Sequence, residues 1–82
     1  MKDKKELPRR DQLQSILESA ASISHEMNQP LTGITGYCML IQEDLNQDDP
    51  LYEEVGEIKK QAIRLEELVQ RLQQIIRSGS EL

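Results

Sequence analysis

The sequence is poor in aromatic residues: among 82 residues it has no Phe, no Trp and only two tyrosines, Tyr37 and Tyr52. Because a β-sandwich normally fills its core with aromatic and β-branched side chains, this composition disfavours that fold and favours an all-α domain. In so short a chain, an ordering cost of roughly 1.5 kcal/mol per residue nearly cancels the gain from apolar burial. We therefore expect a second subunit to contribute to the core.

Cysteine and long hydrophobic runs are also scarce. Cys38 is the only cysteine, so no internal disulfide is possible, and we expect a reduced thiol in the core. No run approaches the roughly 20 apolar residues of a membrane span, and residues 1–10 lack the apolar stretch of a signal peptide. These features predict a cytoplasmic segment without direct membrane contact, whether or not its parent protein is membrane-anchored.

Basic residues are too few to suggest a nucleic-acid partner. Asp and Glu total 15 against 10 Lys and Arg, which gives a net charge of −5. Neutralising phosphates requires clustered Lys and Arg, so nucleic acid is disfavoured as a ligand. The one basic cluster falls within residues 1–10, where Asp3 and Glu6 interrupt it. We interpret these ten residues as a solvated leader or linker.

The sequence from Leu13 to Leu45 carries a broad apolar stripe with the period of an α-helix. With Leu13 at heptad position a, positions a, d and e are mostly apolar, which is the wide face that a bundle helix buries. Asp11 and Gln14 resemble a capping box and predict a helix over about residues 11–46. The stripe comprises Leu13, Ile16, Leu17, Ala20, Ile23, Ser24, Met27, Pro30, Leu31, Ile34, Tyr37, Cys38, Ile41, Asp44 and Leu45.

A second helix is predicted after a tight turn at about residues 46–49. Asp49 is an Asx N-cap before Pro50 at the first helical position. We expect this helix over about residues 50–77, with Gly79 as its C-terminal breaker and residues 79–82 as a linker. With Leu51 at position a, its stripe comprises Leu51, Glu54, Val55, Ile58, Gln61, Ala62, Leu65, Leu68, Val69, Leu72, Ile75 and Ile76.

The short turn makes the two helices antiparallel neighbours. One hairpin cannot cover two such wide apolar stripes, whereas two hairpins can cover them by sharing a core. The sequence therefore predicts a domain over residues 11–78 that folds as a two-helix antiparallel hairpin and homodimerises into a four-helix bundle.

His25 is the only histidine, and it falls at heptad position f, which we expect to be the most outward position of the wheel. Pro30 follows inside the same helix, where a proline removes a backbone hydrogen bond and costs about 3 kcal/mol. Gly33 and Gly36 each cost roughly 1 kcal/mol more relative to Ala. A purely structural helix has little reason to keep these residues together, although periodicity alone leaves His25 open to an incidental surface role.

The chemistry available to His25 is that of a nucleophile or proton carrier. A free imidazole is largely neutral at pH 7 and keeps one unprotonated ring nitrogen. Glu26 could accept a hydrogen bond from Nδ1 and leave Nε2 free to attack, but adjacent helix residues do not face each other, so Glu26 must reach around the helix. A zinc helix would need a second histidine at position 29, which is Gln29, and the sequence has no phosphate-binding loop.

The segment from Ser24 to Leu31 resembles the H-box of sensor histidine kinases. The match lies in His25, Glu26, Pro30 and Leu31. This motif belongs to the dimerisation and histidine-phosphotransfer (HisKA-type) domain of two-component systems, and the resemblance extends over about residues 11–77.

The resemblance implies a role for each matching residue. His25 becomes the phosphoacceptor that attacks the γ-phosphate of ATP, Glu26 its orienting base, and Pro30 the proline that lets the helix bend. The phosphoryl group then passes to an aspartate of a response-regulator receiver domain. ATP and magnesium belong to a separate catalytic domain of the same kinase, expected after residues 79–82, so the segment holds no cofactor itself and is expected to be inactive alone.

The resemblance also directs attention to residues beyond the H-box. Phosphatase-competent members usually carry Asn or Thr four residues after the histidine, where this sequence has Gln29, whose longer arm puts phosphatase activity in doubt. Met39, Leu40 and Ile63 are apolar at outward heptad positions, and we interpret them as part of a surface that docks the receiver. Scattered surface apolar residues are the alternative interpretation.

Two other function classes stay open from the sequence. A stand-alone histidine-phosphotransfer bundle would keep His25 without a kinase domain in the same chain. A non-catalytic dimerisation or adaptor hairpin would leave His25 incidental.

Overall fold

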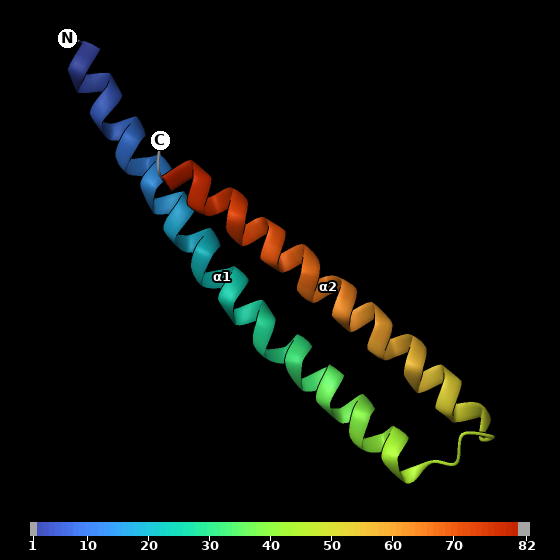
Figure 1. Ribbon diagram of the computed structural model, residues 1–82. Coiled ribbons are helices and arrows are strands. Elements are labelled where there is room, and N and C mark those ends of the chain that lie inside the picture. Colours follow the sequence, from blue (N-terminus) through green and yellow to red (C-terminus); the bar gives the residue numbers. More distant parts are fainter. Residues whose placement is uncertain (1, 81–82) are drawn as a thin grey trace.

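The chain folds into two antiparallel helices, α1 (Lys2–Asp44) and α2 (Pro50–Ser80), that lie side by side along a rod of 71 × 15 × 14 Å (Figure 1). The structure is a computed structural model that describes the backbone of residues 2–80 and the side chains of residues 9–79. No strand occurs in the described range. The predicted all-α hairpin is confirmed.

The helix α1 begins at Lys2 and not at Asp11 as predicted. Asp11 and Gln14 lie inside the helix, so the capping-box interpretation is wrong, and the Gln14 amide donates instead to Glu18 Oε1 at 3.3 Å. Residues 2–10 are mostly Lys, Glu, Leu and Arg, which are good helix formers, and extending an existing helix is easier than starting one. The expected leader is therefore a helical extension that projects past the end of α2 (Figure 1).

The turn at residues 45–49 and the start of α2 agree with the predicted N-cap. The Leu51 backbone N–H donates to Asp49 Oδ1 at 2.9 Å, and the Tyr52 N–H donates to the Asp49 carbonyl at 2.9 Å. These bonds satisfy two backbone donors that an uncapped helix would leave without partners. Pro50 takes the first helical position, where it needs no partner for its nitrogen.

The helix α2 continues to Ser80, three residues beyond the predicted end at Arg77. Gly79 does not act as a breaker, because no glycine of the described chain has a positive φ. It packs close to α1, since a Cβ at Gly79 would lie 3.4 Å from Leu17 Cδ2. Of the predicted linker 79–82, Gly79 and Ser80 are thus helical, and residues 81–82 lie outside the described residues.

The hairpin seam is the line along which α1 and α2 bury each other. Its members share heptad position e of both predicted stripes, and they are the most buried side chains of the described chain. Cys38 is among them as a free, buried thiol, as predicted. We define the hairpin seam as Ser24, Leu31, Cys38, Ala62, Val69 and Ile76.

Polar side chains at heptad position b border this seam. Thr35 Oγ1 lies 3.0 Å from Glu66 Oε1, and Lys59 Nζ donates to Gln42 Oε1 at 3.2 Å. The Gln42 amide also donates to the Tyr52 carbonyl at 3.2 Å, next to the turn. The contact between the helices is therefore a narrow line of small and medium apolar side chains beside a row of hydrogen bonds.

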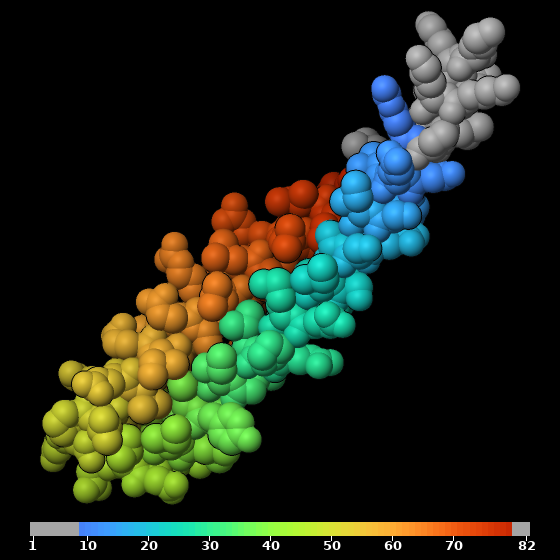
Figure 2. Space-filling model, turned by 180° about the vertical axis from the view of Figure 1, so that it is seen from behind, coloured from blue at the N-terminus to red at the C-terminus, as the bar shows by residue number. Residues whose placement is uncertain are grey.

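Positions a and d of both stripes face away from the hairpin seam and remain exposed. Among the described residues, thirteen of the sixteen exposed large hydrophobic side chains occupy these positions. Figure 2 shows one side of the rod, on which the side chains of the two helices lie next to each other along its length. We define the outer face as Leu13, Ile16, Ile23, Met27, Ile34, Tyr37, Ile41, Leu51, Ile58, Leu65, Leu68, Leu72 and Ile75.

In the part of the chain that the structure describes, no helix is both long enough and apolar enough to cross a membrane.

Candidate functional site

His25 lies on α1 about halfway along the rod and is exposed, as predicted. Its position f is not the most outward one, however. The partner helix lies on the side of positions b and e, so position f borders the hairpin seam. The side chain is therefore open to solvent and within reach of α2 at the same time.

The two helices approach closely beside His25 because their facing residues are small. Ser24, one residue before the histidine, is completely buried, and its hydroxyl donates to the Ala21 carbonyl at 2.8 Å. This bond satisfies the hydroxyl within α1, so Ser24 can face α2 without needing a partner there. Ser24 and Ala21 thus leave room for α2 side chains to reach His25.

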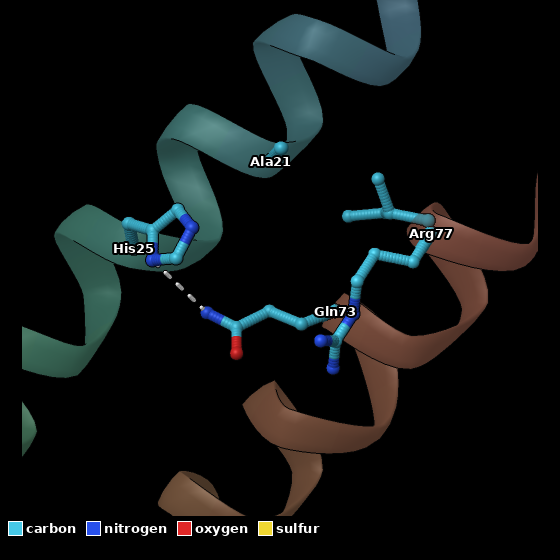
Figure 3. Close-up of a pocket in the computed structure, with 5 residues that line it drawn as sticks. Ala21, His25, Gln73 and Arg77 are labelled. Atoms are coloured by element: carbon cyan, nitrogen blue, oxygen red, sulfur yellow. Dashed lines mark hydrogen bonds between the residues drawn. The ribbon is translucent and has the colours of Figure 1, made fainter. Parts of the chain in front are cut away.

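Gln73 of α2 is the polar neighbour of the His25 ring. Its amide Nε2 lies 3.5 Å from His25 Nδ1, and Figure 3 shows the amide extended across the gap between the helices toward the ring. The contact joins residues that are 48 positions apart in the chain. Gln73 is half-buried at position b, so its side chain stem is held against the seam while its amide reaches outward.

A shallow hollow of about 130 Å³ opens next to this pair. Ala21 and Ile76 contribute its apolar lining, and His25, Gln73 and Arg77 contribute polar groups (Figure 3). Arg77 follows Gln73 by one helical turn, so both project from the same side of α2. An imidazole, an amide and a guanidinium therefore share one solvent-open site, and the guanidinium is a good donor to phosphate oxygens.

Glu26 and Gln29, the other two predicted site residues, are both exposed on α1. Gln29 lies one turn after His25, which places the two side chains on one side of the helix. Glu26 is rotated by about 100° from His25 around the helix axis. The structure brings neither of them into a hydrogen bond with His25, whose polar contact among the described residues is Gln73.

The sequence does not predict Gln73 as a site residue, and it predicts Arg77 only as the end of the second helix. The position of the turn, however, indicates which stretch of α2 lies opposite His25. His25 lies as far before the 46–49 turn as Gln70 lies after it, and Gln73 is one helical turn beyond Gln70. Counting outward from a short turn in this way identifies the stretch of α2 that faces His25, although it does not identify which side chain reaches the ring.

The described residues contain no group of three or more His, Cys, Asp or Glu side chains that could hold a metal ion.

Comparison with known proteins agrees with the helical hairpin. Residues 15–81 match the family described as the His Kinase A (phospho-acceptor) domain. No curated protein and no solved structure matches the chain. Because the family match covers most of the sequence and includes both helices, the chain belongs to the phosphoacceptor-domain family of histidine kinases.

Proposed function

We propose that His25 is the phosphoacceptor of a histidine kinase, phosphorylated from ATP that a separate catalytic domain holds. The observation that carries this proposal is the exposure of the only histidine, at an H-box position, within a family defined by phosphoacceptor chemistry. Its solvent-open position at the border of the hairpin seam leaves room for an ATP-bearing domain to approach.

The transfer is a substitution at phosphorus. The Nε2 lone pair of His25 forms a bond to the γ-phosphorus while the bond from that phosphorus to the bridging oxygen breaks and ADP leaves. Such reactions depend mostly on alignment and on neutralising charge, and the magnesium that neutralises it travels with ATP on the catalytic domain. Arg77, which lines the same hollow as His25, adds a cation on the hairpin side.

Glu26 and Gln29 supply the remaining roles in this proposal. Glu26 accepts the Nδ1 proton by adopting a rotamer that reaches around α1, and its exposure allows that rotation. Gln29 faces the same side as His25 and holds a water for removal of the phosphoryl group from a receiver, with lower efficiency than Asn or Thr because its arm is longer.

The outer face supports homodimerisation into a four-helix bundle. Leu65 and Leu68 are 46% and 45% exposed in the lone hairpin although they occupy the a and d positions typical of a buried core. A patch of this extent on a soluble protein normally marks an interface. A second copy presents the same aliphatic face, and a two-fold arrangement pairs each face with its equivalent.

Phosphotransfer onward requires a surface for the receiver domain. Met39, Leu40 and Ile63 are the exposed large hydrophobic residues outside the outer face, at 51%, 57% and 39% exposure. They lie between His25 and the 46–49 turn along the rod, so a receiver seated on them stays beside the phosphorylated ring. We assign them to receiver docking, and the receiver aspartate then takes the phosphoryl group from His25.

The test is phosphorylation in trans. The chain is incubated with ATP, magnesium and a histidine-kinase catalytic domain, and the protein-bound phosphate is assayed for stability. A phosphate on nitrogen is lost in acid and stable in base, and we expect it to disappear in His25→Ala. Thr32→Ala removes a nearby exposed hydroxyl and is the matched control that should keep the label. An acid-stable phosphate, or one that survives His25→Ala, contradicts the proposal.

A further inference from the structure

The hollow beside His25 has no acidic residue in its lining, although the chain as a whole has a net charge of −5. Its polar lining consists of the imidazole, the Gln73 amide and the Arg77 guanidinium (Figure 3). Within the described part of the chain, Arg77 forms no ion pair with a carboxylate. Its charge is therefore available to an anion that enters the hollow.

The two helices carry little negative charge around this site. Over residues 68–80, α2 has two arginines and no Asp or Glu. Over residues 12–42, the acidic residues of α1 are Glu18 and Glu26 alone. The Glu18 carboxylate accepts a hydrogen bond at 3.3 Å from the preceding turn, on the side away from His25, and Glu26 is rotated by about 100° around the helix axis. The surroundings of the hollow thus favour an anion in an otherwise acidic chain.

We infer that the hollow is a phosphoryl-binding site in which Arg77 holds the oxygens of phosphorylated His25. A phosphoryl group carries about two negative charges at neutral pH and offers three acceptor oxygens. The guanidinium presents a planar fork of N–H donors that matches these oxygens, and the Gln73 side chain can donate a further N–H. The inference rests on the proposed function for the presence of this group, but the site acts after the transfer, on how long the group stays.

The hairpin places Arg77 within reach of a group bound to the ring. Arg77 is at position f of α2 and His25 is at position f of α1, and both line the same hollow. Ile76, one residue before Arg77, is buried in the hairpin seam and fixes this turn of α2 against α1. The Arg77 side chain is exposed, so its guanidinium can turn toward the ring while the helices stay in place.

Arg77 should lengthen the lifetime of the phosphohistidine. In hydrolysis, a water oxygen forms a bond to phosphorus, the P–N bond breaks, the ring nitrogen takes a proton from that water and inorganic phosphate leaves. The cleavage is driven by electron density on the phosphoryl oxygens and by protonation of the leaving ring. A guanidinium on those oxygens withdraws electron density and disfavours a second positive charge beside it, so both effects slow the loss of the group.

The test measures the lifetime of phosphohistidine that is made without a kinase domain. Phosphoramidate phosphorylates exposed histidines: its phosphorus bonds to a ring nitrogen, its own P–N bond breaks, and ammonia leaves with the ring proton. Because His25 is the only histidine, 31P NMR then follows one kind of phosphohistidine after the reagent is removed. We expect the signal to decay about two- to fivefold faster in Arg77→Gln than in wild type at neutral pH.

Three further variants separate the site from net charge. Arg71→Gln is the matched control and should decay like wild type, since Arg71 is exposed on α2 and outside the lining of the hollow. Arg77→Lys keeps the charge but loses the fork, so its decay should be intermediate. Gln73→Glu places a carboxylate in the hollow and should decay faster than wild type. Circular dichroism checks that each variant keeps its helix content.

Salt supplies a second readout. In about 1 M KCl, where the Debye length is about 3 Å, the lifetimes of wild type and Arg77→Gln should converge. Equal lifetimes of these two proteins at low salt overturn the inference. Decay of Arg71→Gln as fast as that of Arg77→Gln also overturns it, because the effect would then belong to net charge.

The two levels of proposal fail separately. A chain that phosphoramidate labels on His25, but that histidine-kinase catalytic domains with ATP never label, contradicts the proposed function. Labelling of His25 by a catalytic domain, with equal lifetimes in wild type and Arg77→Gln, contradicts the role of Arg77 alone.

Discussion

The hairpin seam and the outer face are built from different residues although they run along the same two helices. The seam has Ser24, Cys38 and Ala62 among its six members and is bordered by the Thr35–Glu66 and Gln42–Lys59 hydrogen bonds. The outer face consists almost entirely of Leu, Ile and Met, and it is exposed in the single chain. The hairpin thus buries its less hydrophobic side and leaves the more hydrophobic side uncovered.

The two surfaces therefore differ in what they can do: the outer face is available for assembly, and the hairpin seam sets the geometry around His25. A second copy on the outer face would supply most of the core, since burial of apolar area is the main stabilising term in such bundles. The seam instead fixes how close α1 and α2 lie, and with it the distance from Gln73 to His25. Because His25 borders the seam and not the outer face, covering the outer face leaves the imidazole open to solvent.

The largest expected effect comes from charging the outer face. If the outer face forms the core of the proposed dimer, Leu65→Glu combined with Leu68→Glu places carboxylates in that core, which costs several kcal/mol per group unless the subunits separate. We expect sedimentation to show loss of the dimer and circular dichroism to show loss of helix. Ile63→Glu, on the same helix but outside the outer face, should keep the dimer while it weakens phosphotransfer to a receiver.

If the double variant sediments like the wild type, the outer face is not the dimer interface. Loss of the dimer in Ile63→Glu as well would show that the assembly uses a wider surface than the outer face.

A pair of alanine substitutions compares the two regions at neighbouring residues. Val69 is 3% exposed in the seam and Leu68 is 45% exposed on the outer face. Val69→Ala should lower the free energy of unfolding by about 2 kcal/mol in any state of assembly. Leu68→Ala should cost at least as much, about 2–5 kcal/mol, if a second copy covers it.

Urea denaturation at several protein concentrations measures both effects, because the stability of a dimer depends on concentration. In a lone hairpin Leu68→Ala would change the free energy of unfolding by less than about 0.5 kcal/mol, and that result would argue against a covered outer face.

The smallest effect concerns two helical glycines. A Cβ at Gly36 would meet no atom within 4 Å, whereas a Cβ at Gly56 would lie 3.2 Å from Gln42 Nε2. Gly36→Ala should therefore raise the free energy of unfolding by about 1 kcal/mol, the helix-propensity difference. Gly56→Ala should raise the free energy of unfolding by less, because the Gln42 amide that is hydrogen-bonded to Tyr52 and Lys59 has to move. If thermal denaturation shows the same increase in stability for both variants, the polar border of the seam is not tightly packed.

The sequence predicted the features of this hairpin that depend on local signals. Two helical periods, the Asp49 cap before Pro50 and the exposure of His25 all follow from residues close together in the chain. The start of α1 was not predicted because residues 2–10 have no apolar period and contain Pro8, although most of the other residues are good helix formers. The sequence also did not predict that each broad stripe divides into a buried hairpin seam at position e and an exposed outer face at positions a and d. Heptad positions alone do not show on which side the partner helix packs.

The candidate site was predicted only on one helix. The H-box gave His25, Glu26 and Gln29, which are all local to α1. Gln73 and Arg77 enter the site through the pairing of the helices, which depends on the turn length and on the small residues Ala21 and Ser24 that bring α2 close. No motif marks a glutamine that reaches the site through a contact with a residue 48 positions away.

The most direct test of the account is the intact mass of the chain after phosphorylation in trans, measured under alkaline conditions that preserve nitrogen-bound phosphate. We expect that wild type gains the mass of one phosphoryl group, that acid removes it, that fragmentation places it on His25, and that His25→Gln gains nothing. A phosphoryl group on any other residue, or an unchanged wild-type mass after treatment with catalytic domains that phosphorylate other members of the family, would contradict the account.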